Sequence, residues 1–224
     1  LLQEKNALYG RFAVTIKLNE LNYLDTAKFY PDKTPYDKVA HYAVFGGSPF
    51  VNQALRPTAT LRENIVSTIL NPVSAVYLYA SQLLLSDYSV KINAERIFAV
   101  IGNGKKRYSE IEDKLDVKKT GNLAKQMKPL RDLEIISRNY PINKLNDSKK
   151  STFEINDNLL RFYFTFIYKN ASALQVLGAE AFYDEYVAPT LTDFISRRFE
   201  GICRDYFSLQ VRSGKLKGVR NIGS

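Results

Sequence analysis

Basic side chains between residues 101 and 150 are the clearest candidates in this chain for a chemical role, the binding of an anionic partner. The stretch holds 13 lysines and arginines against 7 aspartates and glutamates, a local surplus of +6 within a net charge of +9. Such a surplus attracts nucleic acid, because contacts with phosphates release condensed counterions. The charge of a lysine attracts phosphates, whereas the side-chain amides of asparagine and glutamine can form hydrogen bonds with base edges. The residues predicted to contact DNA are Lys119, Asn122, Lys125, Gln126, Lys128, Lys149 and Lys150.

Three helices followed by a hairpin would have to present these side chains. The first helix would end at the Gly-Asn-Gly turn of residues 102–104, the second would cover residues 109–115, and the third would run from about 120 to 133. Apolar residues recur at helical spacing in the third helix, which places the basic side chains on its opposite face. Extended runs at residues 135–142 and 151–155 flank a polar loop and would form the hairpin.

This succession predicts a winged helix over residues 88–156, in which the third helix enters a DNA groove and the hairpin forms a wing beside it. The alternative is a protein-interaction module, whose basic face stays in solvent while the domain packs within the molecule or on a protein partner. Pro129 lies inside the third helix and removes one backbone hydrogen bond, so the sequence also predicts a kink there.

Short helices with clear start signals occupy residues 21–87. Thr34 and Ser48 are each followed by proline, the pattern of an N-cap with proline at the first helical position. Thr60 has a glutamate three residues later, which is the spacing of a capping box. These signals predict a small helical bundle. Alternating apolar residues predict a short strand before it, at residues 12–18.

A nearly continuous apolar segment follows within residues 157–224. Residues 159–168 are apolar or aromatic except for Arg161 and one threonine. Because a helix that is apolar on every side is buried between layers, we expect this helix, capped by Asn158, to lie inside the molecule. The chain would then break and resume as an amphipathic helix from Pro189.

Three further motifs lie along the chain. They are Leu8-Tyr9-Gly10-Arg11 before the strand, Gly46-Gly47-Ser48-Pro49 in the helical bundle, and the series Phe199, Glu200, Ile202, Cys203, Arg204, Tyr206 and Phe207. Together they resemble prokaryotic and archaeal AAA-type ATPases that carry a C-terminal winged helix and a nuclease-like region, domain of unknown function 234. The resemblance implies that Arg11 is an arginine finger or sensor, that Gly46, Gly47 and Pro49 contact adenine, and that Glu200 is an early helical glutamate of a nuclease site.

The same resemblance implies a division of the chain and a mainly α fold. Residues 1–20 would end an AAA core, 21–87 would form its helical lid, 88–156 the winged helix, and 157–224 the helical start of a truncated nuclease-like domain. No G-x-x-x-x-G-K-[ST] loop occurs in the chain. ATP and Mg²⁺ are therefore expected to bind only in the full-length protein, and this chain alone is expected to be a fragment that hydrolyses no ATP and holds no metal.

Composition points to a cytoplasmic protein without a membrane partner. No apolar run approaches the roughly eighteen residues of a membrane span, and the first residues lack the pattern of a signal peptide. Cys203 is the only cysteine, which excludes an internal disulfide. His41 is the only histidine, which argues against a histidine-rich metal site and a Ser-His-Asp triad.

Overall fold

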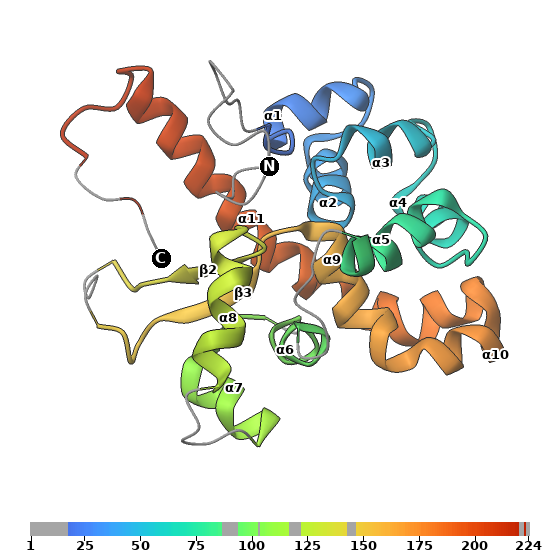
Figure 1. Cartoon of the computed structure of the whole chain (residues 1–224). Helices are drawn as coiled ribbons and strands as arrows, with labels where there is room; N and C mark the ends of the chain where they lie inside the picture. Colours follow the sequence, from blue (N-terminus) through green and yellow to red (C-terminus); the bar gives the residue numbers. More distant parts are fainter. Residues whose placement is uncertain are drawn as a thin grey trace, which may run out of the picture.

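The computed structural model describes residues 18–86, 94–102, 104–116, 122–142, 147–219 and 222. The protein is mainly helical, with a small three-stranded sheet and a long C-terminal helix (Figure 1). The mainly α fold predicted from the sequence is confirmed. Arg11 and residues 12–17 of the predicted first strand lie outside the described residues. Within the described ranges, none of the helices combines the length and apolar character that crossing a membrane requires.

A bundle of short helices forms the first part of the fold. It comprises α1 (Tyr23–Thr26) with a 3-10 turn (Ala27–Phe29), α2 (Pro35–Phe45), α3 (Pro49–Ala54), α4 (Leu61–Asn64) extended by a π turn (Ile65–Ile69), and α5 (Ala75–Ser86). The predicted start signals are confirmed. The hydroxyls of Thr34 and Ser48 each accept a backbone N–H in the first turn of their helices, and Thr60 and Glu63 form a complete capping box.

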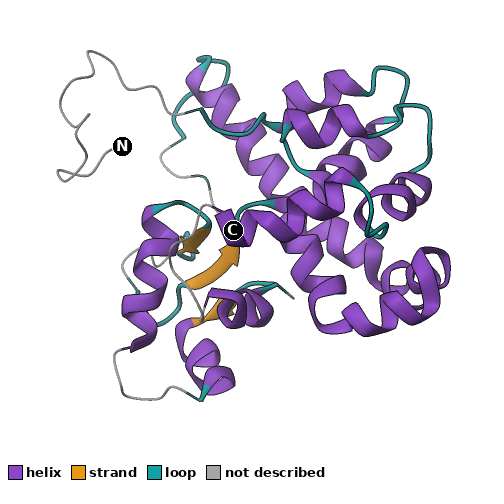
Figure 2. Ribbon diagram, turned by 45° about the vertical axis from the view of Figure 1, so that its right-hand side comes forward, coloured by secondary structure: helices purple, strands orange, loops and turns teal. Residues whose placement is uncertain are grey.

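A unit of three helices and three strands follows. It consists of α6 (Ala94–Ile101), β1 (Lys106–Arg107), α7 (Tyr108–Leu115), α8 (Asn122–Asp132), β2 (Ile136–Asn139) and β3 (Thr152–Ile155). The strands are antiparallel in the order β1-β3-β2 and lie together in Figure 2. The three helices and the hairpin occur as predicted, whereas the strand β1 was not predicted. Two residues are too short to show alternation, and Lys106 pairs with a residue far along the chain, Phe153.

The C-terminal part is helical throughout. It runs through α9 (Asn158–Phe162), a π turn (Tyr163–Ile167), a 3-10 turn (Tyr168–Asn170), α10 (Ala171–Phe182), a second π turn (Tyr183–Val187) and α11 (Ala188–Arg212). The predicted cap of α9 is wrong by one residue. Asp157 is the N-cap, and its carboxylate accepts the N–H of Leu160 at 2.7 Å. Asn158 is the first helical residue instead, and its amide donates to the carbonyl of Tyr42 at 2.7 Å.

The helix formed by α9 and its π turn lies between two hydrophobic cores. Leu159 and Phe162 belong to the first core, which α2 to α5 share with α10 and α11. Leu160 and Phe164 belong to the second core, which α6 to α8 share with the strands. Phe162 and Phe164 are 0% and 1% exposed. Burial of this helix between layers is thus confirmed, and Figure 1 shows α9 between the two groups of elements.

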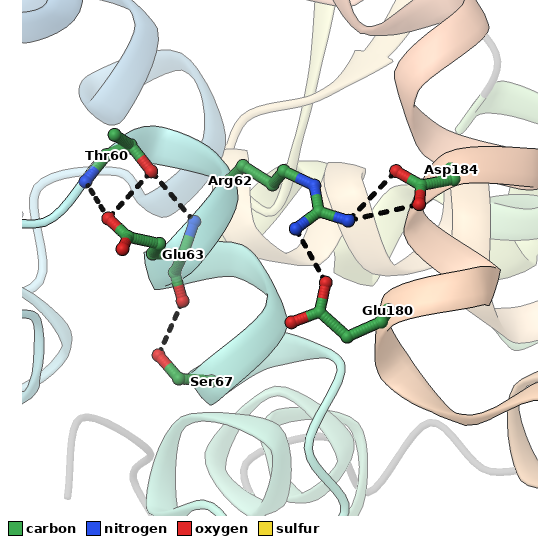
Figure 3. A network of polar contacts seen from close by, with 6 residues as sticks. All are labelled: Thr60, Arg62, Glu63, Ser67, Glu180 and Asp184. Atoms are coloured by element: carbon green, nitrogen blue, oxygen red, sulfur yellow. Dashed lines mark hydrogen bonds and ion pairs between the residues drawn. The ribbon is translucent and has the colours of Figure 1, made fainter.

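The helices after residue 157 complete the first core, and an ion-pair network joins them to the bundle at the surface. Arg62 on α4 pairs with Glu180 at 2.6 Å and with Asp184 at 3.0 Å (Figure 3). Its guanidinium also lies over the ring of Tyr183, 5.1 Å from the centroid. Exposed pairs of this kind add little stability, so the network fixes the position of α10 against α4 more than it stabilises the fold.

A residue in the left-handed conformation ends α8. Glu134 has φ 58, and its N–H donates to the carbonyl of Arg131 at 2.9 Å. The N–H of Ile135 donates to the carbonyl of Leu130 at 2.9 Å, which completes a Schellman motif. Glycine is the usual residue at this position because a Cβ is disfavoured there.

We expect Phe164→Ala to lower the free energy of unfolding by about 3–5 kcal/mol, because Phe164 fills the second core from a helix that also belongs to the first. Its ring lies 5.2 Å from that of Phe98, centroid to centroid. Urea unfolding followed by circular dichroism measures the change. Val176→Ala, at a side chain 83% exposed, is the matched control and should leave the midpoint nearly unchanged. Equal effects of the two substitutions would contradict the two-core arrangement.

Glu134→Gly should raise the free energy of unfolding by about 1 kcal/mol, because glycine adopts the left-handed conformation without a Cβ clash. Thermal unfolding compares the variant with the parent protein. Lys114→Gly, in the regular helix α7, should lower stability by a similar amount. A loss of stability in Glu134→Gly would show that the glutamate side chain stabilises this turn.

Candidate nucleic-acid interface

A cavity lined by basic side chains lies among α7, α8 and the β2–β3 hairpin, and we call it the basic groove. Its volume is about 680 Å³. The cationic side chains that line it are Lys128, Arg131, Arg138 and Lys149. Among the described residues that line the groove there is no aspartate or glutamate. An excess of positive charge along the lining creates a local potential that attracts anions.

The floor of the basic groove is hydrophobic. Tyr108 of α7, Met127 of α8 and Phe153 of β3 line it, and the last two are each 3% exposed. The rings of Tyr108 and Phe153 lie 6.3 Å apart, centroid to centroid. A hydrophobic floor beneath a cationic rim suits a sugar-phosphate backbone, since the sugar can lie on the floor while its phosphates meet the rim.

Arg138 holds the turn that carries Lys149. Its Nε donates to Oγ of Ser151 at 2.8 Å, and a terminal nitrogen donates to the carbonyl of Ser148 at 3.1 Å. The guanidinium also lies over the ring of Tyr140, 5.0 Å from the centroid. These contacts fix the end of the turn against β2, so Lys149 reaches the groove from an ordered part of the hairpin.

Most residues predicted to contact DNA lie on accessible surface. Those exposed are Asn122, Lys125, Lys128, Lys149 and Lys150, whereas Gln126 is half-buried and Lys119 lies outside the described residues. The structure brings Lys128 and Lys149 to the same groove. The other described residues of the prediction do not line it. Lys128 also pairs with Asp132 at 3.7 Å, an exposed and weak contact. The helix α8 continues through Pro129 to Asp132.

Sequence reasoning missed two cations of the groove, Arg131 and Arg138. Arg131 was detectable, because it follows Lys128 by three residues and therefore lies on the same side of the helix. Arg138 was not detectable from the sequence, because its position depends on the register of β2 against β3. In that register Arg138 lies opposite Phe153.

The glycines predicted to contact adenine are enclosed by the chain itself. Gly46 has φ 71 and ends α2, and both Gly46 and Gly47 are buried. A Cβ on Gly47 would lie 1.9 Å from the carbonyl oxygen of Leu21, whose N–H donates to the carbonyl of Gly47 at 3.0 Å. Pro49 is exposed at the first position of α3. Close packing against residue 21 therefore explains Gly47, and the adenine contact stays a prediction.

Two carboxyl groups meet beside these glycines. The carboxylate of Glu20 accepts the N–H of Gly47 at 3.3 Å and lies next to Asp157. Glu20 is exposed as a whole residue, yet its carboxyl group is enclosed. Burial, and then the charge of Asp157, raise the pKa of Glu20 to about 7. Burial also raises the pKa of Asp157.

Glu200, which the resemblance places near a nuclease metal site, is part of an ion-pair network on α11. It pairs with Lys105 at 3.3 Å and with Arg204 at 3.0 Å. In the portion of the chain that the structure describes, no group of three or more histidine, cysteine, aspartate or glutamate side chains is placed to hold a metal ion.

The raised pKa of Glu20 predicts a specific dependence of stability on pH. A carboxyl whose pKa is higher in the folded state favours folding when protonated, so this contribution is full below its usual value of 4.5 and is lost as pH rises through about 7. Urea unfolding at pH 5 and pH 8 should show a larger loss of stability between these values in the parent protein than in Glu20→Gln.

The matched control for this experiment is Glu63→Gln. Bonds from Thr60 lower the pKa of Glu63, so its contribution is present at neutral pH and lost only as the solution becomes acidic. Burial lowers the pKa of His41 in all three proteins, so that effect cancels in the comparison. Parallel pH profiles of the parent and Glu20→Gln would contradict the assignment.

The chain is similar in sequence to a protein family and to an archaeal protein. Residues 163–224 match the family DUF234, described as archaea bacterial proteins of unknown function. The chain is 24% identical over 217 residues to an uncharacterized protein of Methanocaldococcus jannaschii, a match that covers 96% of this chain and 48% of that protein. The chain thus spans about half the length of this curated relative. No solved structure matches the chain. Its C-terminal 62 residues are therefore similar to an archaeal and bacterial family without a described function.

Proposed function

We propose that the unit from α6 to β3 is a winged helix that binds DNA. The basic groove is the observation that carries the proposal: it has four cations, a hydrophobic floor, and no carboxylate among its described lining residues. Lys128 and Lys149 would contact the phosphate backbone, together with Lys119, Lys125 and Lys150. Asn122 and Gln126 would approach base edges from the same helix.

The topology of the unit supports this proposal. Helix, strand, helix, helix and a hairpin follow one another, and the first strand joins the far side of the hairpin in the order β1-β3-β2. This places α8 beside the hairpin, so that a duplex entering the groove could meet the helix and the wing together.

Exposure of the helix face favours DNA over the alternative of an interaction module packed within the molecule. Asn122, Lys125 and Lys128 are exposed, and the apolar side of α8 alone faces the second core, through Leu123, Met127 and Leu130. A face used for packing on the helical bundle would be covered. The interaction module stays the outcome to expect if DNA does not bind.

We further propose that the whole protein is a cytoplasmic ATPase of the AAA type, of which this chain is the C-terminal part. The motifs at Arg11 and at Gly46, Gly47 and Pro49 support the proposal, as does the greater length of the archaeal relative. ATP and Mg²⁺ would be held mainly by a phosphate loop that this chain lacks. The winged helix would then couple DNA binding to the nucleotide state of the ATPase.

Fluorescence anisotropy with a labelled duplex of about 20 base pairs, at several salt concentrations, tests DNA binding. Lys128→Gln and Lys149→Gln should each weaken binding to every sequence and reduce the slope of log affinity against log salt by about one. Lys169→Gln removes the same charge from an exposed site outside the groove and is the matched control. It should leave the slope unchanged.

The outcome that would overturn the DNA proposal is absence of duplex binding by the parent protein at low salt. Equal effects of all three substitutions would indicate attraction by net charge alone instead of a site. In either case the interaction module becomes the better explanation of the unit.

A further inference from the structure

Arg161 is a buried charge with an unused hydrogen-bond donor. The residue lies on α9 and is 4% exposed. Its guanidinium lies over the ring of Phe194, 5.0 Å from the centroid. No acceptor within the described residues meets the buried Nε. Burying a cation without satisfying its donors is costly, so an unsatisfied buried donor needs an explanation, of which a bound ion is one.

Two cavities meet at this side chain. One, of about 340 Å³, is lined by residues that include Lys105, Lys106, Arg161 and Arg197. The other, of about 230 Å³, shares Arg161, Arg197 and Gly104 with the first. Arg161 and Arg197 therefore line both cavities. Their elements, α9 and α11, belong to the first core, whereas Lys106 comes from β1 of the winged-helix unit.

A glycine makes room for the second guanidinium. Gly104 has φ 114, and a Cβ built there would lie 3.0 Å from a terminal nitrogen of Arg197. Any side chain at this position would be strained and would press on Arg197. Gly104 therefore lies close to the end of the Arg197 side chain.

Charge at the larger cavity is positive overall. Four cations line it against two carboxylates, Glu154 and Glu200. Glu200 is already paired with Lys105 and Arg204, and Glu154 accepts the amide of Asn139 at 2.5 Å. Burial, and then the neighbouring charge of Arg198, lower the pKa of Arg161 to about 10. The guanidinium of Arg161 therefore stays charged at neutral pH. The lining of the larger cavity thus carries more positive than negative side chains.

We propose that this junction binds a small anion with a phosphate group, held by Arg161, Arg197 and Lys106. Guanidinium groups present planar, paired donors that suit phosphate oxygens, and lysine adds a point charge. A volume of about 340 Å³ is at the small end of ligand sites, which fits inorganic phosphate or a small phosphorylated molecule. The proposal is independent of DNA binding in the basic groove. Because the site joins the first core to β1, its occupant bridges the helical part and the winged-helix unit.

Thermal unfolding in inorganic phosphate, with ionic strength held constant by sodium chloride, tests the site in the full chain. A ligand that binds only the folded state raises the melting temperature in a saturable way. Arg161→Gln should abolish the phosphate-dependent rise. Lys106→Gln, on a half-buried strand residue that leaves both cores intact, should weaken apparent phosphate affinity about tenfold. Isothermal titration calorimetry of the same proteins measures this affinity directly, even if Arg161→Gln folds poorly.

Lys169→Gln is the matched control, because it removes an exposed cation that lines neither the junction nor the basic groove. It should retain the phosphate response of the parent protein. A response that is absent in the parent, or that Lys169→Gln and Lys106→Gln weaken equally, would overturn the proposal. If Lys106→Gln and Arg161→Gln weaken duplex binding while phosphate alone has no effect, the anion is a backbone phosphate of DNA and the small-molecule assignment is wrong.

Discussion

The burial of one apolar helix holds this protein together. The helix formed by α9 and its π turn contributes Leu159, Phe162 and Phe166 to the first core and Leu160 and Phe164 to the second. Side chains on successive positions of a helix point in different directions, so a helix without a polar face can serve two cores at once. Removal of this helix would expose both cores. The two parts of the fold therefore depend on a segment that follows α1 to α5 and the unit from α6 to β3 in the sequence and precedes α10 and α11.

Charged side chains lie on and beside this helix where it meets the two parts of the fold. Asp157 caps the first turn of the helix and lies beside Glu20. Arg161, one turn later, lines a cavity together with Arg197 of α11 and Lys106 of β1. Each of these groups is energetically unfavourable in isolation, because burial penalises a charge. They are concentrated where the helical part meets the unit from α6 to β3, which is where we propose that an anion binds.

The basic groove depends on the same architecture in a different way. Its cations come from α8 and from the hairpin, and the packing of Met127 and Phe153 in the second core sets the distance between them. Arg138 then orders the turn that carries Lys149. The groove therefore combines buried hydrophobic residues with exposed lysines, whose long side chains could follow a phosphate backbone in the proposed DNA contact.

The sequence by itself determined the local elements, because caps and hydrophobic periodicity act within a few residues. Thr34, Ser48 and Thr60 identified helix starts, and the apolar run at residues 159–168 identified the buried helix. Only the tertiary structure decided which distant groups meet. The pairing of β1 with β3, the groove shared by Lys128 and Lys149, and the cavity around Arg161 all join residues far apart in the chain. Sequence spacing carries no information about such contacts, because packing between elements, and not periodicity within them, sets their geometry.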